Sequence, residues 1–303
     1  MEQGVSFVIP VFNKEAWLPD VLDSIRAQTG DFAREHVFVD DGSSDASMEV
    51  VRARTADWPN VVIREQDNHG SAHATNRGIE AASMPFVKFV DADDLMPRRA
   101  TETLLAALAA HPECCLAWGD LENFDSPDEL DLDAFPDAPS VEVIADPLKR
   151  ALHSSMFNPT QIIVRRAALL ETGGCDERVV HSQEYGMSLR LARRWPFAKV
   201  DATVAYQYRV MPGGLSFNRG RQLGRVTRAA ANFIRDFPDL PLDARQFACR
   251  RAAGRAWNFR RRNHGATVLS PWFARYLRAK LPMRSGHAEF MDRCVAAFET
   301  DAA

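Results

Sequence analysis

The chain has 303 residues and a formal net charge of -4, and 46% of its residues are apolar while 26% are charged. These values are typical of a folded globular protein with one large domain or two ordinary ones, and they exclude a disordered or collagen-like chain. No run of about 18 uncharged apolar residues is present to span a bilayer, and the first residues lead into a strand-like run rather than a secretory signal. Five cysteines without C-x-x-C spacing argue against a disulfide framework or a zinc ribbon and favour a reducing cytoplasm.

The charge is unevenly distributed along the chain. Residues 1–214 carry 20 Lys and Arg against 34 Asp and Glu, a net charge of -14, whereas residues 215–303 carry 17 against 7, a net charge of +10. Either the two parts attract each other, or the basic part approaches an anionic surface or substrate. The sequence leaves both interpretations open.

Four short apolar runs in the first third of the chain have the length of buried strands, and each is followed by a turn and a segment with helical spacing. The strand-like runs are residues 5–10, 37–39, 61–63 and 86–90, and the helical segments are residues 17–25, 48–56, 72–82 and 100–110. This alternation predicts an α/β fold with a mostly parallel, Rossmann-like sheet and helices on both faces. Ligands of such sheets bind beyond the carboxyl ends of the strands.

The rest of the chain is less regular. Residues 120–146 contain ten acidic side chains and no basic one, and their prolines predict an irregular, solvated excursion. A strand, two helices and a last strand are expected after it, at residues 159–165, 166–172, 183–194 and 204–209. From residue 218 the Arg- and Ala-rich sequence has helical spacing, which predicts a helical appendage.

Carboxylates gather at the predicted strand ends. They are Asp40, Asp41 and Asp45 after the second strand, and Asp91, Asp93 and Asp94 after the fourth. Because crowded carboxylates repel one another, they predict a divalent metal or a polyhydroxyl ligand between them, although each Asp could instead cap a helix or form an Asx turn. Residues i and i+2 of an extended segment project the same way, so Asp91 and Asp93 can face one ligand, and their oxygens suit Mg²⁺ or Mn²⁺.

Neither a G-x-G-x-x-G fingerprint after the first strand nor a P-loop is present, so a metal is expected to supply phosphate contacts. The motifs of this chain resemble those of family 2 of the inverting GT-A glycosyltransferases. The resemblance rests on residues 8–13, 40–45, 68–78 and 91–94, in this order and spacing. It covers residues 5–95 well and continues more loosely through residues 118–120, 173–177 and 183–185 to residues 208–216.

The resemblance implies a GT-A domain over residues 1–217. The basic helical region predicted from charge and helical spacing follows it over residues 218–303. Within the domain, residues 1–119 are the nucleotide-sugar half and residues 120–217 the acceptor half. It also implies which residues bind the nucleotide-sugar: Pro10, Phe12, Asn13, Asp40, Asp41, Asn76, Arg77, Asp91 and Ala92.

Individual roles follow from the same resemblance. Phe12 is expected to stack on a pyrimidine, Asp91 to meet the ribose and Asp93 to bind the metal that neutralises the departing diphosphate. Arg77 is expected to balance the negative charge of the donor, with the alternative that it only extends from the surface of its helix.

The acceptor hydroxyl needs a general base. The family usually has an Asp, often within Glu-Asp, where this chain has Gln183-Glu184-Tyr185. Glu184 is therefore the expected base, one methylene longer than the usual residue. Asp120, His181 and Tyr185 are assigned to the acceptor side.

The resemblance thus implies an inverting, hexosyltransferase-type enzyme that uses Mg²⁺ or Mn²⁺. It would move a sugar from a nucleotide-sugar, with a UDP-sugar favoured, to a glycan or lipid-linked hydroxyl in surface polysaccharide or glycolipid synthesis. We expect a cytoplasmic protein with peripheral contact to an anionic membrane through its basic tail, and no nucleic-acid partner. The alternatives are a non-catalytic nucleotide- or sugar-binding module of the same fold and a sugar nucleotidyltransferase.

Overall fold

Residues 4–208 and 219–301 are described by this computed structural model, and their strands form one nine-stranded sheet. The strands are β1 Gly4–Val11, β2 Ala33–Asp40, β3 Val61–Glu65, β4 Phe86–Phe89, β5 Asp94–Leu95, β6 Leu116–Phe124, β7 Val141–Ile144, β8 Ile162–Arg165 and β9 Phe197–Tyr208. Their order is β3-β2-β1-β4-β8-β6-β9-β5, with β7 paired to β9. The expected α/β class is confirmed.

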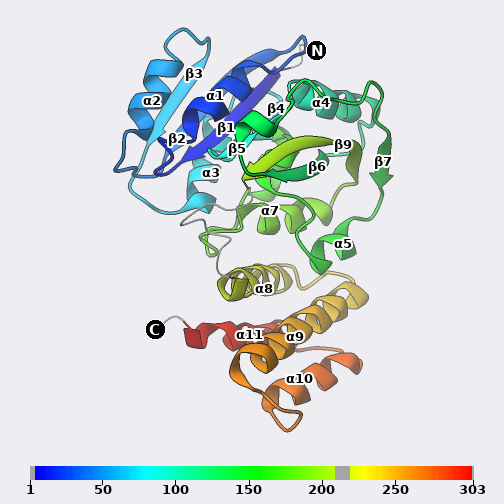
Figure 1. Ribbon diagram of the computed structural model, residues 1–303. Coiled ribbons are helices and arrows are strands. Elements are labelled where there is room, and N and C mark those ends of the chain that lie inside the picture. The colour runs from blue at the N-terminus through cyan, green and yellow to red at the C-terminus, as the bar shows by residue number, and fades with distance from the viewer. Residues whose placement is uncertain (1–3, 209–218, 302–303) are drawn as a thin grey trace.

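The helices cover both faces of the sheet and continue beyond it (Figure 1). The α-helices are α1 Leu18–Arg26, α2 Ser47–Arg54, α3 Ser71–Ala81, α4 Ala100–Ala110, α5 Leu148–His153, α6 Arg166–Thr172, α7 Gln183–Ala192, α8 Arg219–Asp236, α9 Leu242–His264, α10 Pro271–Lys280 and α11 His287–Val295. The short 3₁₀ helices include η1 Pro127–Glu129, η2 Pro159–Gln161 and η4 Ala296–Asp301.

The first four strands run parallel, as their buried apolar runs predict. Val8 of β1 lies in one hydrophobic cluster, whereas Phe7 and Ile9 lie in the other, because successive side chains of a strand point to opposite faces. In register, Val11 at the end of β1 pairs with Asp40 at the end of β2. The carboxyl ends of the parallel strands therefore lie at one edge of the sheet.

Helix α1 shows how local sequence sets an element. A proline stands in its first turn, Asp20 follows there, and Arg26 lies in its last turn, all of which suit the unpaired backbone groups and the dipole of a helix. Its buried stripe includes Val21 and Ile25, which pack on the same face of the sheet as Ile9. The helix thereby fixes the loop between β1 and α1, which carries Asn13 and Lys14.

The second half of the sheet differs from the expectation in two ways. First, β8 runs antiparallel to both β4 and β6, so the sheet is mixed. Second, residues 120–146 are not wholly irregular, because β6 extends to Phe124 and Val141–Ile144 forms the edge strand β7. Backbone pairing with neighbouring strands stabilises these residues as strands, although their high acidic content predicted an irregular, solvated segment.

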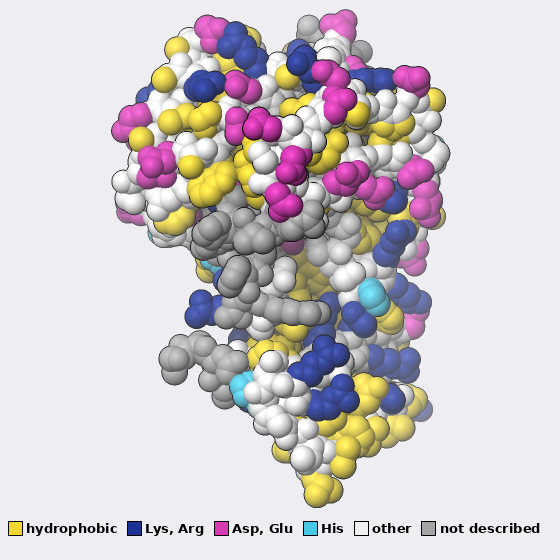
Figure 2. Space-filling view, in the orientation of Figure 1, with side chains coloured by type: hydrophobic (Ala, Val, Ile, Leu, Met, Phe, Trp, Pro, Cys, Tyr) yellow, Lys and Arg dark blue, Asp and Glu magenta, His cyan; other side chains and the backbone are white. Residues whose placement is uncertain are grey.

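The C-terminal helices form a layer below the α/β part. Helix α8 packs on α7, α9 packs on α5, and α10 and α11 complete the layer. The expected domain boundary at residue 217 and the motif over residues 209–216 lie outside the described residues. Figure 2 shows Asp and Glu gathered over the α/β part, whereas Lys and Arg dominate the helical layer on this face.

Candidate functional site

The loops after β1 and β2 are tied together at the carboxyl edge of the sheet. Asn13 has a positive φ of 52°, and its Oδ1 accepts a hydrogen bond of 2.8 Å from the Ser44 backbone. Asp40 accepts a bond of 3.0 Å from the backbone N–H of Ser43. Phe12 stands beside this junction with 44% of its side chain exposed, as a platform for stacking requires. Pro10, two residues earlier on β1, pairs with Val39.

Asp41 holds the loop before α3. Its Oδ1 accepts hydrogen bonds from the Gln66 amide at 2.8 Å and the His69 backbone at 2.9 Å, and its Oδ2 accepts one from the Gly70 backbone at 2.8 Å. Asp41 is only 3% exposed. By accepting these three hydrogen bonds, the Asp41 carboxylate organises the loop before α3. A nucleotide that contacts Asp41, as predicted, would have to share a carboxylate oxygen that already accepts a hydrogen bond.

Three carboxylates approach one another beyond β4. Burial and, to a smaller extent, the negative charges of Asp93 and Glu184 together raise the pKa of Asp91 to about 7. Lys14 opposes this effect, and its ammonium group forms an ion pair with Asp93 at 2.5 Å. Ala92, between the two aspartates, is buried. The structure thus brings residues from the turn after β4 and from α7 into one electrostatically coupled group.

A buried polar layer beneath Asp91 was not expected from the sequence. The Thr160 hydroxyl accepts a hydrogen bond from the Asp91 backbone at 3.0 Å and donates one to Asp94 at 2.6 Å. Lys88 is fully buried and donates to the backbone carbonyls of Thr160 and Phe89. Burial lowers the pKa of Lys88 to about 7, against the charges of Asp94 and Asp91. A lysine in the middle of the apolar run 86–90 was the available signal.

Glu184 lies in the first turn of α7. Burial raises the pKa of its carboxyl group to about 7, and hydrogen bonds from its own backbone and from Ser155 oppose this shift. The Ser155 hydroxyl donates to its Oε1 at 3.5 Å. A carboxylate whose pKa is close to neutral can accept a proton from a hydroxyl during a reaction.

Asn76 and Arg77 lie on α3, and their side chains bond to residues other than these carboxylates. The Asn76 side chain accepts a bond of 2.8 Å from the Cys175 backbone and donates one of 2.6 Å to Glu177, so it fastens α3 to the turn before α7. Arg77 is exposed and pairs with Glu80 one turn away. These contacts match the alternative of a surface arginine, and the expected nucleotide contacts stay predictions.

The three acceptor-side residues are found in different surroundings. Asp120 pairs with Lys199 at 3.1 Å on the wall of a cavity of about 460 Å³. His181 contacts the Ser71 hydroxyl at 3.3 Å, and burial lowers its pKa, with Arg225 adding to the shift and Asp41 opposing it. It therefore faces the start of α3 on the donor half.

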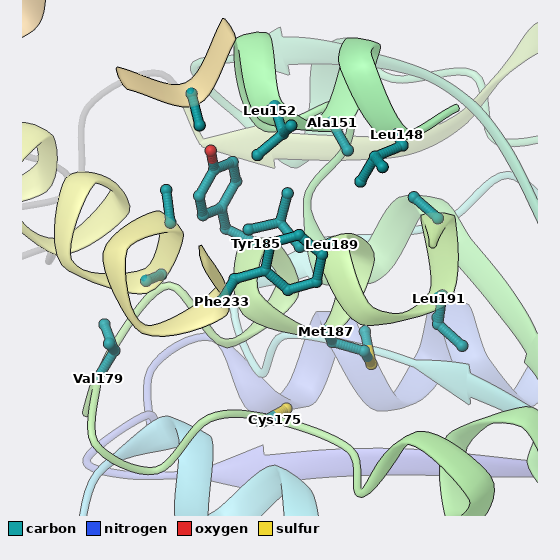
Figure 3. Packing of buried hydrophobic residues seen from close by; sticks show 14 of the residues in the cluster. Leu148, Ala151, Leu152, Cys175, Val179, Tyr185, Met187, Leu189, Leu191 and Phe233 are labelled. Atoms are coloured by element: carbon teal, nitrogen blue, oxygen red, sulfur yellow. The ribbon is translucent and has the colours of Figure 1, made fainter. Parts of the chain in front are cut away.

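Tyr185 is fully buried. Figure 3 shows its ring among Leu152, Leu189 and Phe233, which come from α5, α7 and α8. Contact with an acceptor does not fit this position, because an i+1 neighbour on a helix points to a different side from Glu184. The sequence could not reveal that α8 would cover this face.

Within residues 4–208 and 219–301, no cluster of three or more His, Cys, Asp or Glu side chains forms a preassembled metal site. Asp93 is partly exposed and has Lys14 on one oxygen. Mg²⁺ and Mn²⁺ are commonly held by one or two carboxylates together with substrate phosphates. The crowding of Asp91, Asp93 and Glu184, which raises the pKa of Asp91, fits a site that a cation completes when a diphosphate is bound.

Two further features describe the surroundings of the site. A cavity of about 620 Å³ lies between α5, the end of α7 and the α8–α9 connection. Four of its charged residues form two ion pairs, Lys149 with Asp243 and Arg193 with Asp239. These pairs join α5 and the end of α7 to the region around the start of α9. In the described part of the chain, no helix has the length and apolar character needed to cross a membrane.

Comparison with known protein families gives one match over more than half of the chain. The model of the family described as "Glycosyl transferase family 2" matches residues 6–169. An uncharacterized glycosyltransferase of Escherichia coli, YibD, is 37% identical over 101 residues, which is 33% of this chain and 29% of YibD. The uncharacterized protein y4gI of Sinorhizobium fredii is 30% identical over 218 residues, 69% of this chain and 23% of that protein. The matches therefore span less than a third of these two relatives.

Solved structures share the fold at low sequence identity. TarS of S. aureus in complex with UDP-GlcNAc superposes with a TM-score of 0.68 and 17% identity over 91% of this chain and 79% of TarS. The mannosyltransferase PcManGT of Pyrobaculum calidifontis, in complex with GDP-Man and Mn²⁺, superposes with a TM-score of 0.61 and 18% identity, covering all of this chain and 89% of that one. These likenesses confirm the expected GT-A architecture.

Proposed function

The chain belongs to glycosyltransferase family 2, and on that premise we propose that it transfers a sugar from a nucleotide-sugar to a hydroxyl acceptor with inversion. The observation that carries the proposal is that Glu184 and Asp93 both lie close enough to Asp91, beyond β4, for their negative charges to raise its pKa. A base and a pair of donor-binding carboxylates there meet the requirements of a single in-line displacement at the anomeric carbon.

Glu184 acts as the general base. A pKa of about 7 makes its carboxylate basic enough to take the acceptor proton while it remains largely ionised slightly above neutral pH. The hydrogen bond from Ser155 holds one oxygen, which leaves the other for the acceptor hydroxyl.

The donor lies along the ends of β1, β2 and β4. Phe12 stacks on the base, because its exposed ring is an apolar surface beside Asp40 and Asn13. Asp91 binds the ribose, and Asp93 would hold Mg²⁺ or Mn²⁺ beside the diphosphate. When bound, the metal neutralises the charge that develops on the leaving diphosphate. A UDP-sugar donor of the hexose type is favoured, since TarS was crystallised with UDP-GlcNAc.

The acceptor belongs to surface polysaccharide or glycolipid synthesis in this proposal. The net charge of +10 on residues 215–303 supports peripheral contact with an anionic membrane at its cytoplasmic face. One relative is named for a biosynthetic role: the PGL/p-HBAD biosynthesis glycosyltransferase of Mycobacterium bovis is 34% identical over 119 residues, 38% of this chain and 46% of that protein.

The decisive experiment measures turnover of the nucleotide-sugar. The protein is incubated with Mn²⁺ and a panel of nucleotide-sugars, and release of the nucleoside diphosphate is followed with and without sugar acceptors. We expect release from one donor, inversion at the anomeric carbon by NMR, and loss of release in EDTA. A donor that binds with metal but is neither hydrolysed nor transferred would instead identify a non-catalytic binding module.

A further inference from the structure

The cavity beside Glu184 carries an excess of positive charge. It has a volume of about 460 Å³ and is lined by side chains that include Trp118, Asp120, Arg150, His153, Ser155 and Lys199. Lys199 is paired with Asp120. Arg150, in the last turn of α5, forms no ion pair within residues 4–208 and 219–301. The wall of the cavity therefore presents one cation without a counter-ion.

Two more guanidinium groups lie behind this wall. Arg251 and Arg255 of α9 both donate hydrogen bonds to the backbone carbonyl of His153, at 2.9 and 2.8 Å. In the part of the chain that the structure describes, neither pairs with a carboxylate. Their charges add to burial in lowering the pKa of His153. Hydrogen bonds to a neutral carbonyl leave the charge of both arginines uncompensated, so the field in the cavity is positive.

The cavity is also connected to the reacting group. Ser155 lines the cavity and donates its hydroxyl proton to Glu184. A molecule held by Arg150 would thus lie next to the carboxylate that takes the acceptor proton. The volume of the cavity, about 460 Å³, falls within the range found for sites that bind small molecules. The charge of the cavity and its link to Glu184 point to the acceptor rather than the donor, whose proposed ligands lie at the ends of β1, β2 and β4 and do not line this cavity.

We propose that this cavity binds the acceptor through an oxyanion, a phosphate ester or a carboxylate, with Arg150 as the residue in direct contact. Arg251 and Arg255 act through the field and by holding the His153 carbonyl at the end of α5. The inference rests on the proposed transferase function and deepens it by naming the acceptor class: a hydroxyl compound with negative charge rather than a neutral sugar.

The test measures binding without turnover. Isothermal titration in EDTA is carried out with glycerol 1-phosphate, glucuronate and uncharged glycerol. The variants are Arg150→Ala and, as the matched control, Lys149→Ala, which removes the same charge from the neighbouring residue of α5. Lys149 is exposed, pairs with Asp243 and lines the other cavity rather than this one. Charge-assisted hydrogen bonds are strong enough for their loss to weaken binding about tenfold or more.

We expect one of the two anions to bind at least about tenfold more tightly than glycerol to the parent and to Lys149→Ala, and to lose this preference in Arg150→Ala. The anion that binds more tightly, glycerol 1-phosphate or glucuronate, then shows whether the cavity prefers a phosphate or a carboxylate. Equal binding of anions and glycerol, or binding of anions that Arg150→Ala leaves unchanged, would overturn the inference. Because no donor or metal is used, this result is independent of the turnover experiment, whose failure would refute the transferase function itself.

Discussion

The ammonium group of Lys14 forms an ion pair with a carboxylate oxygen of Asp93 at 2.5 Å. The two residues are far apart in the sequence, and the loop after β1 and the turn after β4 bring them together at the edge of the sheet. Lys14 also lies over the ring of Trp17. The lysine therefore occupies a position that a cation bound to Asp93 would need.

This pair predicts that Lys14 competes with the metal. In Lys14→Met, the affinity for Mn²⁺ in the absence of a donor should increase roughly two- to fivefold, because a partly exposed ion pair is worth up to about 1 kcal/mol. Electron paramagnetic resonance of free Mn²⁺ measures this affinity. Lys149→Met serves as the control, since it removes a lysine remote from Asp93. An unchanged or lower affinity in Lys14→Met would show that the lysine does not compete.

Replacement of the expected base should stop turnover without preventing donor binding. General base catalysis contributes roughly 10²- to 10⁴-fold to a rate, so Glu184→Gln should lower kcat by about that factor while the Kd of the donor changes little. Stopped-time assays of diphosphate release together with titration calorimetry separate the two quantities. Glu171→Gln, on the surface of α6 and paired with Arg194, is the matched control. A kcat near that of the parent would assign the base to another group.

The pKa of Glu184 predicts a change in stability with a definite sign. The folded protein holds a proton on this carboxyl up to about pH 7, whereas the unfolded chain releases it near the ordinary value for Glu. Between these two values the folded state binds more protons, so the free energy of unfolding decreases as pH rises. Glu184→Gln has no carboxyl group at this position, so its free energy of unfolding does not decrease for this reason as pH rises. In EDTA it should be more stable than the parent by about 1–3 kcal/mol at pH 8 and equal to it at pH 4.

Urea unfolding at the two pH values measures that difference. Glu171→Gln should show no comparable gain at pH 8, because its carboxyl group is exposed and ion-paired. A Glu184→Gln variant that is no more stable than the parent at pH 8 would mean that Glu184 titrates near its ordinary pKa.

The three hydrogen bonds to Asp41 predict a structural role. In Asp41→Asn, one carboxylate oxygen becomes an NH₂ group that faces a backbone or amide donor, so at least one bond is lost in a buried place. The cost should be about 1–3 kcal/mol of unfolding free energy. Asp67→Asn makes the same change at an exposed position of the same loop and should be within about 0.5 kcal/mol of the parent. Equal stability of the two variants would remove Asp41 as the organiser of this loop.

The parallel half of the sheet and its carboxylate edge could be predicted because its strands contain short, mostly apolar runs that alternate with turns and helical segments. Val8 and Phe38 fit this pattern and lie in opposite cores. The edge strand β7 could not be predicted, because Val141–Ile144 is short, pairs with one neighbour and lies within an acidic segment. Its stability comes from β9, which is more than fifty residues away in the chain.

The candidate site was predictable to the level of motifs but not of side-chain contacts. A motif places Asn76 and Arg77 on α3. It does not reveal that the side-chain amide of Asn76 forms hydrogen bonds with the backbone of Cys175. It likewise could not show that Tyr185 is covered by α8. The buried Lys88 and the Ser155 contact to Glu184 depend on segments that meet only in the folded chain.

The central claim is that the edge formed by Asp91, Asp93 and Glu184 binds a nucleotide-sugar through a divalent cation. The most direct measurement is the Kd of the donor that the turnover panel identifies, determined by calorimetry with Mn²⁺ and with EDTA in the parent and in Asp93→Asn. The account predicts that Mn²⁺ tightens binding to the parent at least about tenfold and has no such effect on Asp93→Asn. Donor binding to the parent that is equally tight in EDTA, or a metal effect that persists in Asp93→Asn, would contradict it.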